Sequence, residues 1–282
     1  MITAPNTDAV DSTPAPAPAS AAPLLQARGV RHFYGAYQVL DGVDLSLHEG
    51  ELVSVVGPNG AGKTTLIHAL TGFIRPTRGA VKFLGEDIAR RDPVSLATAG
   101  LARSFQLVNV FPDLTVRSAL SVGAASHLRI AHRWARSVSN CPEVDEVVER
   151  IADAVGLRSL LDVSCNLLPH GKRKLLDVAC ALTLHPKVLL LDEPTAGVST
   201  ADKYAVMETL LAAAQRMRIR AIMLIEHDMD LVRRYSSRIV AMQAGRKIAD
   251  LPRDAFFRAS EVLAVVIGRG APETMAAEEA AQ

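Results

Sequence analysis

The stretch Gly57-Pro-Asn-Gly-Ala-Gly-Lys-Thr64 decides the fold, because it matches the pattern GxxxxGK[ST] between two recognisable elements. The apolar, β-branched run at 51–56 predicts a buried parallel strand, and the helical spacing at 64–71 predicts a helix that Gly72 ends. A strand, a glycine-rich loop and a helix in this order bind phosphate through backbone N–H groups and the helix N-terminus. The sequence therefore predicts an α/β fold with a nucleotide site.

Each residue type in this loop suits phosphate chemistry. The glycines let the backbone wrap with its N–H groups pointing inward, Lys63 reaches the β and γ phosphates, and Thr64 offers a hydroxyl to Mg²⁺. The candidate binding residues of the loop are Gly57, Asn59, Gly60, Ala61, Gly62, Lys63, Thr64 and Thr65.

A pair of carboxylates ends a second apolar strand, at Val188 to Glu193. Asp192 and Glu193 should therefore lie at the carboxyl edge of a parallel sheet, which is the usual ligand crevice of open α/β folds. There Asp192 would hold magnesium, and Glu193 would orient or deprotonate the attacking water. A charged strand end can also be merely solvated, and its pairing with the phosphate loop favours the functional interpretation.

Composition excludes several classes of protein. The chain has 282 residues with 31 basic and 30 acidic side chains, a formal net charge of +1, and 49% hydrophobic but only 4% aromatic residues. Near-neutral charge argues against dominant attraction to nucleic acid or to an anionic membrane surface. Three cysteines without a CxxC pair favour packed thiols in a reducing cytosol over a metal knuckle. No stretch approaches the about 18 apolar residues of a membrane span.

The order of elements alternates strands and helices after a strand-rich start. Residues 1–23 are an Ala/Pro-rich leader that we expect to be disordered. Beyond those already named, the expected elements are strands at 39–49, 79–84, 188–191 and 221–226, a strand pair at 238–249, and helices at 143–161, 173–184 and 201–216.

Together these motifs resemble the ATP-binding-cassette (ABC) ATPases. The spacing carries the resemblance, since Asp192 follows Lys63 by 129 positions, with a helical block between them. The resemblance implies an ABC cassette at 24–270 with a RecA-like parallel-sheet core and an N-terminal antiparallel β subdomain. It also implies a helical signature subdomain at about 107–184 and a flexible tail at 271–282. ATP and Mg²⁺ are the cofactors it implies.

Further site residues follow from the resemblance. The segment CNLLPHGKRKLLDVACAL at 165–182 is similar to the family's signature segment, which faces the nucleotide of a second cassette, and this implies that His170 and Gly171 contact ATP. Gln106 and His227 match the family's Mg²⁺- and water-contacting glutamine and its γ-phosphate histidine. Tyr34 matches the aromatic that stacks on adenine. A packed strand aromatic and a structural histidine are the alternatives.

Two positions depart from the family pattern. Pro169 replaces the signature serine, so the serine's contact with the γ-phosphate is missing, although the amides of His170 and Gly171 can remain. Ser199 stands where many cassettes have aspartate, which weakens any inference about communication between the two cassettes at that loop.

In detail, these motifs are most similar to those of the ATPase subunits of bacterial importers for branched-chain and other hydrophobic amino acids. The similar segments are GPNGAGKTT, LTGF, RSFQ, FPDLTV, HGK and EVLAVVIG. This implies a second cassette, identical or paralogous, two transmembrane permease subunits and, indirectly, a periplasmic binding protein, with the chain at the cytoplasmic face of the inner membrane. No nucleic-acid partner is expected. Importers of urea or short amides, a soluble non-transport cassette and a catalytically silent subunit are the alternatives.

Overall fold

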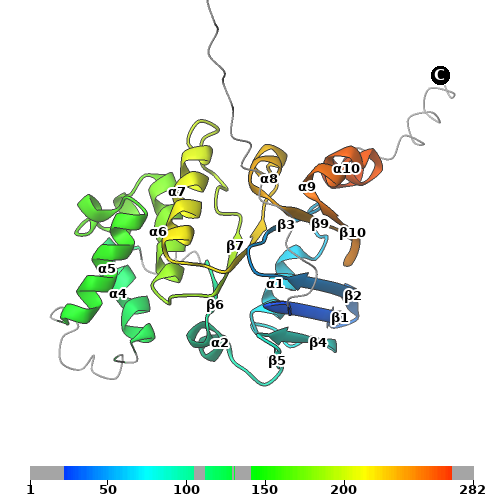
Figure 1. The fold of residues 1–282 in the computed structure, drawn as a ribbon, viewed down its shortest axis with the longest axis horizontal. Helices are drawn as coiled ribbons and strands as arrows, with labels where there is room; N and C mark the ends of the chain where they lie inside the picture. The colour runs from blue at the N-terminus through cyan, green and yellow to red at the C-terminus, as the bar shows by residue number, and fades with distance from the viewer. Residues whose placement is uncertain (1–21, 105–111, 129, 131–140, 269–282) are drawn as a thin grey trace, which may run out of the picture.

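Two sheets and a set of helices make up the computed structural model, which describes residues 22–104, 112–128, 130 and 141–268. Figure 1 shows helices α4 to α7 gathered on the side of β6 and β7, with the small antiparallel sheet away from them. Along the chain, the phosphate loop directly follows strand β3 (Leu52–Val56) of the large sheet and leads into helix α1 (Lys63–Leu70).

The large sheet has the strand order β10-β9-β3-β8-β7-β6, and only β10 runs antiparallel to its neighbour. Its strands other than β10 are short, largely apolar and mostly buried, as in other parallel sheets. In β7, for example, Leu189 and Leu191 pack with the helices, while Val188 and Leu190 pack toward the antiparallel sheet. The remaining bounds are β6 Leu101–Arg103, β7 Val188–Asp192, β8 Ala221–Ile225, β9 Arg238–Gln243 and β10 Arg246–Pro252.

The small sheet is antiparallel throughout, with the strand order β2-β1-β4-β5. Apolar residues alternate along β2, where Val43, Leu45 and Leu47 are buried against α1 and the large sheet. The strands are β1 Leu25–Tyr34, β2 Tyr37–Leu47, β4 Arg78–Phe83 and β5 Glu86–Asp87.

Helices α4 to α10 lie over one face of the large sheet, and α1 with the antiparallel sheet covers the other. Helices α4 to α7 share one apolar core with β7, and α8 to α10 lie over β9, where Phe256 is fully buried. The bounds are α2 Pro93–Ala99, α4 Val116–His127, α5 Pro142–Ala154, α6 His170–Leu182, α7 Lys203–Arg216, α8 Met229–Tyr235, α9 Arg253–Arg258 and α10 Ser260–Ile267. Within the described ranges, no helix combines the length and the apolar character needed to cross a bilayer.

The α/β class expected from the sequence is confirmed: a parallel core, an antiparallel sheet from the N-terminal part and a helical block. The predicted helix at 143–161 was wrong at its end, because α5 stops at Ala154. Gly156 adopts a left-handed φ of 67° there, and a short 3-10 turn follows at Arg158–Leu160. The helix expected from Arg173 begins earlier, at His170, directly after Pro169.

Candidate functional site

The phosphate loop folds around three glycines with positive φ. These are Gly57 at 149°, Gly60 at 78° and Gly62 at 95°, values that L side chains rarely adopt. A Cβ at Gly57 would lie 2.1 Å from the carbonyl oxygen of Met242, so the fold leaves room only for glycine. The backbone turn therefore ends at the N-terminus of α1, whose positive dipole end favours an anion.

Lys63 is buried and lies folded back over this loop. Its Nζ donates hydrogen bonds to the carbonyl oxygens of Gly57 at 2.7 Å and Pro58 at 3.0 Å. Burial lowers the pKa of Lys63, and the carboxylates of Glu193 and Asp192 oppose that shift. The ammonium group is thus bonded to the loop and lies within the electrostatic influence of the carboxylate pair.

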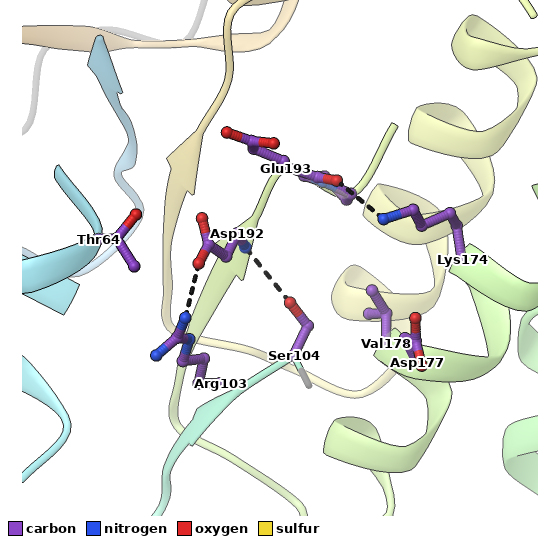
Figure 2. A pocket seen from close by; sticks show the side chains of 9 residues that line it. Thr64, Arg103, Ser104, Lys174, Asp177, Val178, Asp192 and Glu193 are labelled. Carbon is purple, nitrogen blue, oxygen red and sulfur yellow. Dashed lines mark hydrogen bonds and ion pairs between the residues drawn. The ribbon is translucent and has the colours of Figure 1, made fainter. Parts of the chain in front are cut away.

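The carboxylate pair lies where β7 ends, and β6 lies beside it. An oxygen of Asp192 is 2.6 Å from Nη2 of Arg103, and the N–H of Asp192 donates to the hydroxyl of Ser104 at 3.3 Å (Figure 2). The Ser104 N–H in turn donates to the carbonyl oxygen of Leu190 at 2.9 Å. The parallel pairing of β6 with β7 therefore brings a basic residue onto the first carboxylate.

A cavity of about 240 Å³ joins these parts. Thr64 faces Asp192 across it, and Lys174 of α6 approaches from the other side, its Nζ 3.4 Å from the backbone oxygen of Glu193 (Figure 2). The lining residues are Thr64, Arg103, Ser104, Lys174, Asp177, Val178, Asp192, Glu193 and Pro194. The loop, the carboxylate pair and the signature helix thus meet at one place.

Glu193 has a strained backbone and a histidine partner. Its φ is 48°, a left-handed value that costs a non-glycine residue about 1–3 kcal/mol and is common at functional sites. The Glu193 N–H donates to the carbonyl oxygen of Ile225 at 3.0 Å, and Oε1 lies 2.7 Å from Nε2 of His227. Both side chains remain 42% exposed, so solvent reaches this pair.

The signature segment places His170 and Gly171 at the first turn of α6. Pro169 is the N-cap residue, with φ −55° and ψ 150°, and its side chain supplies no capping hydrogen bond. A Cβ at Gly197 would lie 2.8 Å from the His170 ring, so this ring packs against the loop that follows Glu193.

Tyr34 does not line the cavity. It ends β1 opposite Tyr37, is 51% exposed, and meets the His32 ring edge-on at 4.8 Å. The backbone of Val39 in β2 lies against Gly62, so the hairpin that carries Tyr34 adjoins the phosphate loop. Of the other predicted residues, Asn59 and Gly60 are exposed and Ala61 is buried, whereas Thr65 is partly buried. Gln106 lies outside the described residues.

The donors at the cavity fit a magnesium ion. A hydroxyl from Thr64 and a carboxylate from Asp192 are oxygen ligands of the kind that Mg²⁺ prefers, and Mg²⁺ usually keeps several waters and substrate phosphates as its other ligands. In the part of the chain that the structure describes, no group of three or more His, Cys, Asp or Glu side chains could by itself hold a metal.

Sequence reasoning missed Arg103, Ser104 and Lys174 as site residues. Arg103 stands at the start of the RSFQ segment that carries the resemblance, three positions before Gln106. Its proximity to Asp192, 89 positions further along the chain, depends on strand pairing.

Residues 40–196 match the sequence profile of the family described as "ABC transporter". The high-affinity branched-chain amino acid transport ATP-binding protein BraF of Pseudomonas aeruginosa is 32% identical over 235 residues, covering 81% of this chain and 91% of BraF. The corresponding LivG of Escherichia coli K12 is 30% identical over 235 residues, with the same coverage. A solved ATP-binding cassette of an ABC transporter in its ADP conformation superposes with a TM-score of 0.76 at 28% identity, covering 88% of this chain and 100% of that one.

Proposed function

The chain belongs to the ABC transporter family, and on that premise we propose that it is the ATP-binding and ATP-hydrolysing subunit of an importer for branched-chain or other hydrophobic amino acids. The observation that carries the proposal is the meeting of phosphate loop, carboxylate pair and signature helix in one cavity. The names of the relatives favour this cargo over urea or short amides. They likewise favour transport over a soluble, non-transport cassette.

Hydrolysis at such a site needs positioning and charge neutralisation rather than a protein nucleophile. The amides of the loop and the ammonium of Lys63 would hold the phosphates. Glu193 would take the proton of the attacking water, and His227, which already contacts Glu193, would bind the γ-phosphate. Tyr34 would stack on adenine, and Gln106 keeps its proposed place at the water.

Magnesium, when bound by Thr64 and Asp192, would neutralise charge on the phosphate oxygens. In the described structure Asp192 pairs with Arg103. The ion would therefore have to compete with that guanidinium for the carboxylate.

We also propose the assembly in which the subunit works. By their match to the family's signature segment, His170 and Gly171, which start α6 beside the loop after Glu193, would face the ATP of a second cassette, identical or paralogous. Two transmembrane permease subunits would provide the pathway at the cytoplasmic face of the inner membrane, with a periplasmic binding protein acting indirectly and no nucleic acid. The cassette would span residues 24–270, with its helical subdomain at about 107–184 and flexible ends outside it.

Replacing Glu193 with Gln tests the catalytic assignment. The amide keeps the shape of the side chain but cannot accept the proton of water, so turnover should fall about a thousandfold while ATP binding persists. Steady-state phosphate release and the binding of a fluorescent ATP analogue measure the two effects. Gln at the exposed Glu261 is the matched control and should leave both unchanged. Undiminished turnover in Glu193→Gln would show that the base is another group.

The cargo needs a separate experiment. The subunit would be co-purified with the permeases that it binds, reconstituted in liposomes together with the periplasmic binding protein, and assayed for ATP-dependent uptake of leucine, urea and acetamide. Leucine uptake supports the proposal. Uptake of urea or acetamide alone would reassign the importer, and failure of the subunit to co-purify with any permease would favour a soluble cassette.

A further inference from the structure

Glu226, directly after β8, is a buried carboxylate that the proposed chemistry does not use. It is only 4% exposed, although glutamate is almost never fully buried without partners. Across the described ranges, no ion pair joins it to a lysine or arginine. Its two oxygens instead accept hydrogen bonds from two different loops.

The first loop is the one that follows Glu193, and the second carries His227. Oε1 of Glu226 accepts a hydrogen bond from the hydroxyl of Thr195 at 2.5 Å. Oε2 accepts one from the backbone N–H of His227 at 3.1 Å and a long one from that of Asp228 at 3.5 Å. Thr195 is itself only 6% exposed, so this bridge lies out of solvent, where an unmade hydrogen bond is costly.

The bridge closes a ring that includes the reacting pair. Glu193 lies two positions before Thr195, and His227 directly follows Glu226. The imidazole of His227 and the carboxylate of Glu193 meet at 2.7 Å on the solvent side of the ring. The loop after Glu193 also touches His170, which the assembly proposal places toward the second cassette.

We propose that Glu226 is a positioning residue that sets the distance between Glu193 and His227 and couples His227 to the loop after Glu193. The inference rests on the proposed ATPase function of the same site. A displacement of that loop, by a second cassette for example, would move Thr195, and Glu226 would pass the movement to the backbone of His227. Glu226 itself needs no contact with nucleotide.

The hydrogen-bond donors around Glu226 allow substitutions that keep the bridge to be compared with substitutions that break it. Gln at position 226 can still accept from the His227 N–H with its oxygen and donate to Thr195 with its amide, because a hydroxyl both donates and accepts. Val at position 195 keeps the shape of threonine but removes the donor. Ser at position 195 keeps the donor. Glu226→Gln and Thr195→Ser should therefore preserve the bridge, whereas Thr195→Val and Glu226→Ala break it.

Amide hydrogen exchange tests the bridge without any turnover. In Thr195→Val, peptides covering 226–229 and 194–199 should exchange faster, while Thr195→Ser should match the natural protein. Thr183→Val is the control for losing a buried hydroxyl elsewhere, since the Thr183 hydroxyl donates a local hydrogen bond to the carbonyl oxygen of Cys180. Unchanged exchange at 226–229, or a change equal to that in Thr183→Val, would overturn the bridge.

Steady-state kinetics then test whether the bridge positions the residues of catalysis. Losing one buried hydrogen bond should lower kcat about tenfold in Thr195→Val, with KM for ATP unchanged. In Glu226→Ala, kcat should fall at least as far. The double variant Glu226→Ala/Thr195→Val should lose no more kcat than Glu226→Ala alone. A KM effect without a kcat effect, or fully additive losses, would overturn the positioning role. Absence of turnover in the natural protein would refute the proposed function itself, and the exchange experiment would still decide the bridge.

Discussion

Asp228 illustrates how one residue joins two helices near the site. Its Oδ1 accepts hydrogen bonds from the N–H groups of Asp230 at 2.9 Å and Leu231 at 3.3 Å, which caps α8. Its other oxygen pairs with Lys203 at the start of α7. Burial alone would raise the pKa of Asp228, but the bonds from Lys203 and from the two amides outweigh it, and the pKa lies below its ordinary value of 3.8.

This lowered pKa predicts a pH dependence for Asp228→Asn. A carboxyl whose pKa is lower in the folded state stabilises the protein above its unfolded pKa, and that stabilisation is lost as pH falls through the folded pKa. Asn still caps α8 but loses the charge, so the free energy of unfolding should fall by about 1 kcal/mol near neutral pH. The difference should shrink only below about pH 4. Urea denaturation at several pH values measures it, with Asp113→Asn at an exposed turn position as control. A difference that does not vary with pH would contradict the argument.

The sequence predicted the elements that carry the contiguous motifs. Gly57 to Thr64 follow the end of β3, and Asp192 and Glu193 stand at the end of β7, so the local pattern was enough to place both segments. Arg103 and Glu226 were not predicted as contacts because their partners lie 89 and 31 positions away and are brought close only by strand pairing in the sheet. A buried glutamate also has no distinctive sequence pattern.

At the scale of elements, the close approach of α4 and α6 depends on one glycine. A Cβ at Gly123 would lie 2.0 Å from the hydroxyl of Thr183 and 3.0 Å from the carbonyl oxygen of Cys180. Gly123→Ala should therefore lower the free energy of unfolding by about 1–3 kcal/mol, although alanine in an open helix position would raise it. Thermal and urea unfolding measure this change. A higher free energy of unfolding in Gly123→Ala would show that α4 and α6 can move apart enough to accept a methyl group without loss of stability.

Gly171→Ala on α6 is the matched comparison. A Cβ there would lie 3.5 Å from Val206, an ordinary contact, so the fold should keep its stability. If Gly171 faces the nucleotide of a second cassette, turnover should nevertheless fall. The two glycines thus separate a packing requirement from a binding one.

Helix ends were harder to predict than helix existence. The apolar rhythm of 143–161 continues past the real end of α5, because Val155, Leu157 and Leu161 are buried in the same core without being helical. The left-handed Gly156 ends the helix, and a single glycine within an apolar pattern is a weak signal. By contrast, β3, β7 and β8 were predicted within a residue or two, since short runs buried on both faces have few alternatives.

At the scale of the whole molecule, Pro169 should weaken the pairing of two cassettes. The signature serine that it replaces in the family would supply a hydroxyl at the start of α6, and proline supplies none. Pro169→Ser should therefore tighten ATP-dependent dimerisation, by about tenfold for one hydrogen bond to a charged phosphate. Light scattering of the Glu193→Gln protein with and without ATP, at several protein concentrations, measures the dissociation constant.

Serine at this position would also cap α6, and replacing proline increases the conformational entropy of the unfolded chain. Effects on the stability of the monomer must therefore be separated from effects on the dimer. Pro252 offers the control, because it is the N-cap residue of α9 with φ −53° and ψ 146° and likewise makes no side-chain capping bond. Pro252→Ser should change monomer stability in the same way and leave dimerisation alone. If both variants tighten the dimer equally, or neither does, the missing hydroxyl does not limit pairing; tightening by Pro169→Ser alone would place α6 against the nucleotide of the second cassette.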